Sequence, residues 1–262
     1  MLSERQTEIL ESAKRAGRVT VEELAARYEV SVQTIRKDLN ELCTQRLLAR
    51  VHGGAVLSSS IENVGYDARR LIASDEKAAI GRAIADLIPD HASLFVNIGT
   101  TTEAVAQALL HRNDLMVITN NINVASLMRP YPEIEVVIAG GVVRRSDGGV
   151  VGETAVDFIR QFKVDYAVIG ASAIDPDGSL LDYDYREVRV TQAIMENSRN
   201  VILGADASKF DRSAPVRIGH LSQVDVFVTD SATDPVRRAC EIGETRLIET
   251  GAVPHLMPLV AE

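Results

Sequence analysis

Five side chains that can hydrogen-bond to nucleic acid lie on one side of a short predicted helix: Gln33, Thr34, Arg36, Lys37 and Asn40. The other side of this helix is apolar at offsets 0, 3, 7 and 10, with Val32, Ile35, Leu39 and Leu42. The polar side chains can donate to guanine, bond the edge of adenine or hold phosphates. We therefore predict a nucleic-acid contact. The alternative is a small helical packing module in which the polar side of this helix is merely exposed to solvent.

Two further helices are predicted before this one, within a module that spans residues 1–57. Capping-box patterns at Ser3 and Thr20 indicate where the two helices begin, and Ser31 is the expected N-cap of the third. Two helices joined by a tight turn, the second with a polar face, describe a helix-turn-helix.

A β-hairpin is predicted directly after the third helix. Residues 47–57 alternate in character and turn at Gly53 and Gly54. A hairpin in this position is a wing, and its basic side chains could contact the DNA backbone or the minor groove. The predicted DNA contacts of the module are Ser31, Gln33, Thr34, Arg36, Lys37, Asn40, Arg50 and His52.

Charge is divided unevenly along the 262 residues, whose net charge is −9. Residues 1–57 hold nine Lys and Arg against eight Asp and Glu, and the remainder holds 19 against 29. Attraction to phosphate dominates DNA affinity, so an acidic chain as a whole is a poor candidate for DNA binding. A near-neutral module joined to an acidic body is compatible with DNA binding by one face only.

The rest of the chain alternates between β-branched apolar runs and helical segments. The runs lie at residues 94–98, 116–119, 136–139, 167–169, 201–203 and 226–229. This alternation predicts an α/β domain with a mostly parallel sheet covered by helices. In such a sheet, ligands bind beyond the carboxyl ends of the strands.

The first of these carboxyl ends has the composition of a phosphate-binding turn. Gly99 is followed by Thr100, Thr101 and Thr102 at the start of a predicted helix. Glycine lets the backbone approach a ligand, hydroxyls donate, and a helix N-terminus favours an anion. The alternative is an ordinary strand-to-helix turn. The Gly-Lys-Ser/Thr pattern of the nucleotide P-loop is missing.

Polar clusters also follow the later runs, and each could be turn chemistry alone. Taken together, amides and carboxylates suit hydroxyl groups, while a lysine and a helix N-terminus suit a phosphate. The pattern therefore favours a small phosphorylated polyol or sugar. The residues concerned are Asn120, Asn121, Gly140, Gly141, Arg144 and Lys209.

Residues 30–42, followed by 50–55, resemble the signature of the DeoR family of bacterial repressors. Residues 75–262 resemble the effector domain of that family, which is similar to the folds of ribose-5-phosphate isomerase and glucosamine-6-phosphate deaminase. The resemblance implies a transcriptional repressor whose affinity for operator DNA is lowered by a small phosphorylated effector. It is strongest to members that respond to glycerol 3-phosphate; another sugar phosphate is the alternative effector.

The same resemblance adds Asp182, Arg186 and Glu187 to the predicted effector site. Arg186 and Glu187 align with the isomerase segment that holds the general base. The glycine-rich isomerase stretch with a catalytic lysine has no equivalent, because residues 177–183 here read Asp-Gly-Ser-Leu-Leu-Asp-Tyr. A lone Glu187 should not isomerise a sugar efficiently. We therefore predict no catalytic residues, and an isomerase with an appended helical module is the competing function.

The predicted organisation is a DNA-binding domain over 1–57, a linker over 58–74 and an effector domain over 75–262. No apolar run approaches the ~20 residues that span a bilayer, and no secretory signal precedes the first helix. Cys43 and Cys240 match neither a disulfide framework nor a metal-ligand spacing, so a cytoplasmic protein without metal or cofactor is expected. Paired half-sites are usual for such reading modules, which favours a homo-oligomer, a dimer or a tetramer.

Overall fold

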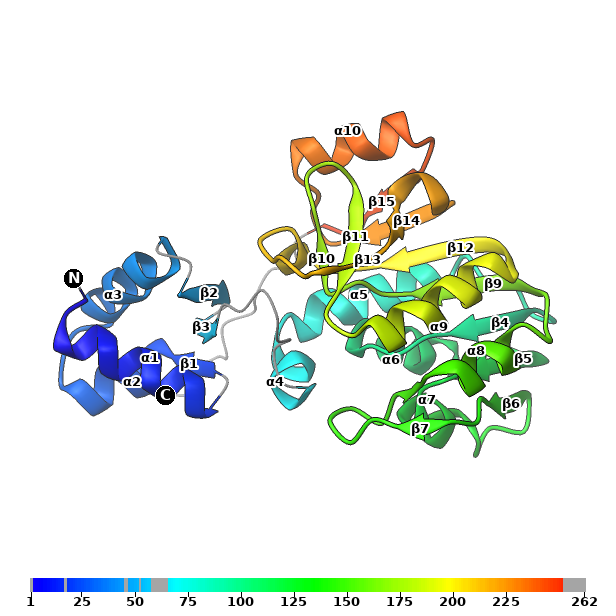
Figure 1. Ribbon diagram of the computed structural model, residues 1–262, viewed down its shortest axis with the longest axis horizontal. Coiled ribbons are helices and arrows are strands. Elements are labelled where there is room, and N and C mark those ends of the chain that lie inside the picture. The colour runs from blue at the N-terminus through cyan, green and yellow to red at the C-terminus, as the bar shows by residue number, and fades with distance from the viewer. Residues whose placement is uncertain (1, 17, 45–46, 52, 58–65, 252–262) are drawn as a thin grey trace, which may run out of the picture.

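The computed structural model describes residues 2–16, 18–44, 47–51, 53–57 and 66–251 (Figure 1). An N-terminal helical module and a larger α/β body account for these residues. Within the described ranges, no helix is both long enough and apolar enough to cross a membrane. The predicted fold class, a winged helix-turn-helix before an α/β effector domain, is confirmed.

The N-terminal module contains three helices and a three-stranded antiparallel sheet in the order β1-β3-β2. The caps form as predicted: the amide of Gln6 donates to the Ser3 hydroxyl, that of Glu23 to Thr20, and that of Thr34 to Ser31. The elements are α1 (Glu4–Ala16), β1 (Arg18–Thr20), α2 (Val21–Tyr28), α3 (Val32–Thr44), β2 (Leu48–Val51) and β3 (Gly54–Leu57).

Helix α3 is fixed to the module by an apolar stripe and by one buried carboxylate. Ile35, Leu39 and Leu42 are fully buried in the core of the module. Val32, expected in this stripe, is 37% exposed because it begins the helix, one turn away from the packed face. Asp38 is buried instead and accepts a hydrogen bond from Arg5 Nε of α1 at 2.6 Å.

Seven parallel strands form the sheet of the body, in the order β15-β14-β12-β9-β4-β5-β6. Along the chain, β5 and β6 are added in turn on one side of β4. The next strand, β9, is added on the other side of β4, and β12, β14 and β15 follow outward from it. The direction in which successive strands are added therefore reverses between β4 and β9. The strands are β4 (Ser93–Val96), β5 (Leu115–Thr119), β6 (Ile134–Ile138), β9 (Val164–Ile169), β12 (Ser198–Gly204), β14 (Val226–Thr229) and β15 (Arg246–Glu249).

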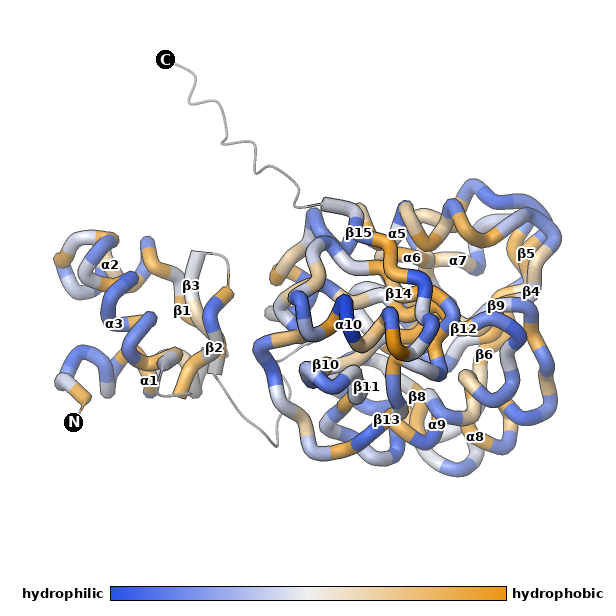
Figure 2. The backbone as a smooth tube through the Cα atoms, turned by 90° about the horizontal axis from the view of Figure 1, so that it is seen from above, coloured by the Kyte–Doolittle hydropathy of each residue, from blue (hydrophilic) through white to orange (hydrophobic). Residues whose placement is uncertain are grey.

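Helices cover both faces of this sheet, so its side chains alternate between two apolar cores. Phe95 packs in one core with the second helix group, and its neighbours Leu94 and Val96 pack in the other with the first group. Hydrophobic segments gather in the middle of the body (Figure 2). The first group is α5 (Ser74–Ala85), α6 (Thr100–Ala108) and α7 (Ile122–Met128); the second is α8 (Glu153–Ile159), α9 (Tyr185–Glu196) and α10 (Asp234–Ile242).

Short strands outside the main sheet were not predicted. A three-stranded antiparallel sheet has the order β10-β11-β13, and β7 pairs with β8. Turns that follow β6 and β9 therefore carry their own small sheets, which bring distant loops to one edge of the body. These strands are β7 (Val142–Val143), β8 (Val150–Val151), β10 (Ala173–Ile174), β11 (Ser179–Asp182) and β13 (Val216–His220).

Part of the segment predicted as a linker is a helix. Residues 66–71 form α4 (Tyr66–Leu71), which lies against α6 of the body. Residues 58–65 lie outside the described ranges. The sequence predicts a helix from about residue 75, with Ser74 as its cap. Helix α5 instead begins at Ser74, and Ala73 is the N-cap residue, with a left-handed backbone and no side-chain cap. A six-residue helix gives too little periodicity for its pattern to stand out in the sequence.

Candidate effector site and DNA-reading surface

The predicted reading face of α3 is exposed. Gln33, Arg36, Lys37 and Asn40 point away from the module core and line one shallow groove along the helix. Thr34 is half-buried, and its hydroxyl is 2.8 Å from that of Ser31. The side chains that could reach base edges therefore share one open surface.

Of the other predicted DNA contacts, Ser31 and Arg50 have local structural partners. Ser31 caps α3, and Arg50 donates to the carbonyl of Gly54 in the hairpin at 3.2 Å. Arg50 is nevertheless exposed on the wing. His52 lies outside the described residues. The geometry thus keeps α3 and one wing arginine available at the surface of the module.

A narrow cavity of about 30 Å³ opens at the carboxyl edge of the sheet, where β4 and β9 meet. This is the point at which the direction of strand building reverses, the usual ligand position in open α/β sheets. Seven predicted effector residues line the cavity: Gly99, Thr100, Thr101, Thr102, Asp182, Glu187 and Lys209. Its other lining residues are Arg69, Ile98, Gly170, Ala171, Ser172 and Gly204.

The floor of the cavity is the turn from β4 into α6. Gly99 is the N-cap of α6 with φ of +148°, a conformation that favours glycine. Thr102 is fully buried, and its hydroxyl donates to the carbonyls of Asn97 and Gly99 at 2.7 and 2.8 Å. The Thr102 hydroxyl therefore holds the turn together. The amides of the first turn of α6 and the hydroxyls of Thr100 and Thr101 remain available to an anion.

Buried cations line one side of the cavity. Lys209 is 7% exposed, and its Nζ donates no hydrogen bond to any residue of the described ranges. Burial and the nearby Arg212 hold the pKa of Lys209 well below its usual range. Arg69 Nε and Arg212 Nη1 are buried without hydrogen-bond partners in the described part of the chain. Asp206 is the nearby carboxylate that partly offsets this positive charge.

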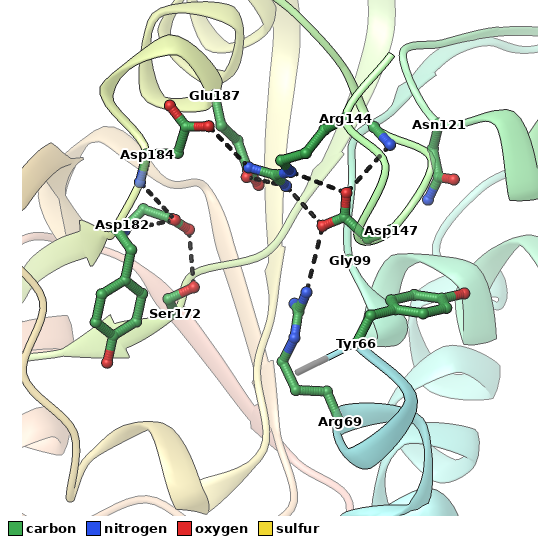
Figure 3. Close-up of polar contacts among 12 residues, drawn as sticks. Tyr66, Arg69, Gly99, Asn121, Arg144, Asp147, Ser172, Asp182, Asp184 and Glu187 are labelled. Carbon is green, nitrogen blue, oxygen red and sulfur yellow. Dashed lines mark hydrogen bonds and ion pairs between the residues drawn. The ribbon is translucent and has the colours of Figure 1, made fainter. Parts of the chain in front are cut away.

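Carboxylates crowd the other side, around Arg144 (Figure 3). Arg144 donates to both oxygens of Asp147 at 2.9 and 2.7 Å, to Asp184 at 3.2 Å and to Glu187 at 2.5 Å. One guanidinium therefore faces three carboxylates, with Asp182 behind them. Arg144, Asp147 and Asp184 do not line the cavity themselves, whereas Asp182 and Glu187 do, and these two carboxyl groups are suited to hydroxyl groups.

Glu187 is the most perturbed carboxyl of this set. Burial, together with the nearby Asp182, raises the pKa of Glu187 to about 8 from an ordinary value of 4.5. Arg144 opposes this shift without cancelling it. Near neutral pH Glu187 therefore carries a proton for much of the time, so it can donate a hydrogen bond as well as accept one. Asp182 accepts from the Ser172 hydroxyl at 2.9 Å.

Several predicted effector residues do not line the cavity. The Asn121 side chain caps α7 and donates to Glu103 at 3.0 Å, and Asn120 donates to the Val150 carbonyl at 3.2 Å. Arg186 is exposed and pairs with Asp184. Gly140 and Gly141 are exposed in the loop after β6. These residues shape or border the edge of the sheet and do not face the cavity.

Sequence reasoning missed the residues that reach the cavity from distant segments. Arg69 comes from α4, and Ser172 from the turn after β9. Arg212, near Lys209, follows the 3-10 turn after β12. The Arg69-Arg70 pair was visible as basic residues in a polar segment, but nothing in its spacing indicates which of the two turns inward. No group of three or more His, Cys, Asp or Glu residues in the described ranges is arranged to hold a metal ion.

Comparison with known families assigns both parts of the chain. Residues 5–61 match the DeoR-like helix-turn-helix domain, and residues 72–231 match the DeoR C terminal sensor domain. The chain belongs to the DeoR family. The helix-turn-helix match covers α2, α3 and nearly all of α1, and the sensor match covers every residue that lines the cavity except Arg69.

Relatives of high identity cover nearly the whole chain. The glycerol-3-phosphate regulon repressor of Escherichia coli (strain K12) is 48% identical over 229 residues, which are 87% of this chain and 91% of that protein. The repressor of the same name from Haemophilus influenzae is 47% identical over 244 residues, 93% and 95% of the two chains. These names confirm the prediction of a DNA-binding transcriptional repressor over that of an isomerase.

Likeness to solved structures is weaker. Ribose-5-phosphate isomerase A from Methanocaldococcus jannaschii superposes with a TM-score of 0.40 at 16% identity, over 53% of this chain and 55% of that one. A likeness of this size carries no conclusion about function.

Proposed function

We propose that this protein is an operator-binding repressor that glycerol 3-phosphate releases from DNA. The exposed polar face of α3 supports the operator part, because four side chains able to bond bases or phosphates line one groove there. Arg36 and Lys37 are the strongest donors on this face, and Gln33 and Asn40 are suited to adenine. The wing, with Arg50, contacts the DNA backbone beside them.

The effector part rests on the division of charge within the cavity. A phosphate sits on the first turn of α6, near Lys209, where Arg69 Nε and Arg212 Nη1 are buried without hydrogen-bond acceptors in the described ranges. The hydroxyl groups of the polyol lie toward Asp182 and Glu187, which can accept and donate. A molecule with one anionic end and one end rich in hydroxyls is complementary to both sides. The proposal of glycerol 3-phosphate itself comes from the names of the relatives.

Calorimetric titration of the full chain tests this assignment. Glycerol 3-phosphate should bind, and glycerol alone or inorganic phosphate alone should bind at least tenfold more weakly, since each fills only one side. Ribose 5-phosphate and fructose 6-phosphate in the same panel test the alternative of another sugar phosphate. Tighter binding of either one would transfer the effector assignment to it. Absence of binding by every phosphate would contradict the proposal.

We also propose that the repressor binds DNA as a homo-oligomer, a dimer or a tetramer. One small reading module seldom supplies specific affinity, and paired half-sites are the usual solution. A repressor of this kind works in the cytoplasm, where a bacterial chromosome lies. Footprinting should show two protected half-sites separated by one helical turn or a multiple of it, about 10 base pairs. Protection of a single half-site by a monomer would contradict this.

A further inference from the structure

Helix α4 is the first described element of the chain after the DNA-binding module. It spans only six residues, far fewer than the ~12 needed for a helix to persist alone in water. Its position therefore depends on contacts with the body. Those contacts come from α5, α6 and α7 and from Asp147, which pairs with Arg144.

Three sets of hydrogen bonds hold α4 in place. The Tyr66 hydroxyl donates to Glu103 of α6 at 2.7 Å and accepts from Asn123 of α7 at 2.9 Å. Lys77, which is 4% exposed, donates to the carbonyls of Arg69 and Ile72 at the end of α4. The third set is made by the Arg69 side chain, which enters the cavity.

Arg69 extends from α4 toward Asp147 (Figure 3). Its side chain is 13% exposed and lines the same cavity as Thr101 and Lys209. Nη2 donates to Asp147 at 3.3 Å, whereas Nε is buried with no hydrogen-bond partner in the described ranges. A buried guanidinium with an unused donor is a strong candidate to bind an anion.

The Asp147 carboxylate is satisfied by hydrogen bonds without Arg69. Arg144 already donates to both of its oxygens, at 2.9 and 2.7 Å, and the amide of Gly149 donates to one of them at 3.2 Å. Arg69 makes the longest of these contacts. If the Arg69 guanidinium moved to a phosphate, Asp147 would remain paired with Arg144, and Arg69 would gain a more highly charged acceptor.

The Arg69 side chain lines the narrow space beside the first turn of α6. A phosphate bound to the amides of that turn would lie within reach of the Arg69 guanidinium. Turning Arg69 from Asp147 to such a phosphate displaces its side chain from its present position. Because the Arg69 backbone belongs to α4 and its carbonyl is held by Lys77, that displacement acts on the helix.

We propose that Arg69 is a ligand of the effector phosphate, and that its transfer from Asp147 to the phosphate shifts α4 and so couples the effector site to the DNA-binding module. This inference rests on the proposed effector function. It assigns to α4 two states, one with Arg69 on Asp147 and one with Arg69 on the phosphate. A ligand couples two sites only through such a difference between states.

The test compares Arg69→Ala with Arg70→Ala in the full chain. Arg70 is the matched control because it neighbours Arg69 on α4, is exposed and does not line the cavity. For each protein, the dissociation constant of glycerol 3-phosphate is measured by calorimetry with and without an operator duplex selected from a random DNA pool. The ratio of the two constants is the coupling factor. Thermal unfolding verifies that each variant is folded.

Arg69→Ala should weaken glycerol 3-phosphate binding roughly tenfold or more and bring the coupling factor close to one. Arg70→Ala should match the wild type in the dissociation constant of glycerol 3-phosphate and in the coupling factor. Unchanged binding in Arg69→Ala would overturn the inference, and so would weakening by the same factor with and without operator. In both cases the proposed effector would stand. If the wild type does not bind glycerol 3-phosphate, the proposed function fails first, and the inference fails with it.

Discussion

Two adjacent threonines at the start of α6 have different roles. The Thr102 hydroxyl is used by two backbone carbonyls, whereas the Thr101 hydroxyl donates no hydrogen bond within the described ranges and lines the cavity. The Thr101 methyl group lies toward Gly204. The residue type alone could not distinguish a ligand from a structural support here.

Thr101→Val should weaken effector binding by on the order of 1–3 kcal/mol, a tenfold to hundredfold loss, because one donor to the phosphate is removed. Operator affinity without effector should stay near normal, since Thr101 belongs to the other domain. Operator release measured against effector concentration checks this. Coincident release curves for wild type and variant would exclude Thr101 from the site. Thr102→Val serves as the contrast: it should lower the melting temperature, because the carbonyl of Asn97 loses a buried partner.

Arg36→Ala should weaken operator binding by ~1–3 kcal/mol if Arg36 contacts a base edge. The melting temperature should hardly change, because the side chain is exposed and opposite the buried Ile35. Mobility-shift titration gives the affinity. Arg238→Ala, which removes an exposed arginine from α10, controls for the change in net charge. Equal losses in the two variants would show a general charge effect.

Glu187 should make the stability of the protein fall as pH rises. Its pKa is raised to about 8 in the folded state, against an ordinary value of 4.5 in the unfolded chain. Between these values the folded state binds more protons, so the free energy of unfolding decreases with pH. Glu187→Gln mimics the protonated form and should be similar to wild type near pH 5 but more stable near pH 8. A melting-temperature difference that stays constant across this range would contradict the assignment.

At the scale of elements, α5 and α6 make the tightest helix contact at the back of the site. A Cβ atom on Gly81 of α5 would lie 2.7 Å from the carbonyl oxygen of Ala104 in α6. Glycine is therefore required for the two backbones to approach. The position of α6, and with it the turn that begins at Gly99, depends on this contact.

Gly81→Ala should destabilise the protein despite the better helix propensity of alanine. Propensity favours alanine by about 1 kcal/mol, but a backbone clash in a packed interface costs typically 1–3 kcal/mol and shifts the helices. Chemical denaturation should show a lower midpoint. Gly140→Ala is the control, because nothing lies within 4 Å of its added Cβ. A Gly81→Ala midpoint at or above the wild-type value would contradict the packing argument.

Elements with a continuous apolar run or a clear helical period were predictable from the sequence, and elements without one were not. The sequence predicts helices at about 102–110, 121–129, 153–162, 186–198 and 235–242, and these coincide with α6 to α10 to within a few residues. Six of the seven strands of the main sheet coincide with the predicted apolar runs in the same way. β15 and the strands β7, β8, β10, β11 and β13 were missed. Length alone does not explain the difference, because β4 and β14 have four residues, as the missed β11 and β15 do. The predicted strands lie in continuous apolar runs, whereas pairing with distant partners determines that the missed segments are strands. Helix α4 was missed because six residues show little helical periodicity.

At the scale of the whole molecule, the sequence predicted where the candidate site lies better than which residues face it. Carboxyl ends of parallel strands share one edge, so Gly99 and Lys209 were expected to meet, and they line one cavity. Asp182, which lines the same cavity, was expected only from the family resemblance. The Asn121 side chain is oriented by the cap that it makes at α7, and the Arg186 side chain by its ion pair with Asp184. The spacing of residues in the sequence does not indicate either interaction. Arg69 could not be predicted, because only the folded path of α4 brings it there.

The buried lysine that caps α4 determines where this protein could be joined to another. Lys77 fixes the carbonyls of Arg69 and Ile72, so α4 is attached to the sensor even though it precedes the sensor match at residue 72. A hybrid regulator that gives this sensor a foreign DNA-binding module should therefore be spliced before Tyr66. A junction at residue 74, where the sequence alone would put it, would exchange the helix and leave the Lys77 ammonium buried against an unrelated segment. Recombination between such regulators, in the laboratory or in a genome, should therefore give a folded hybrid when the junction lies before α4 and not when it lies after α4.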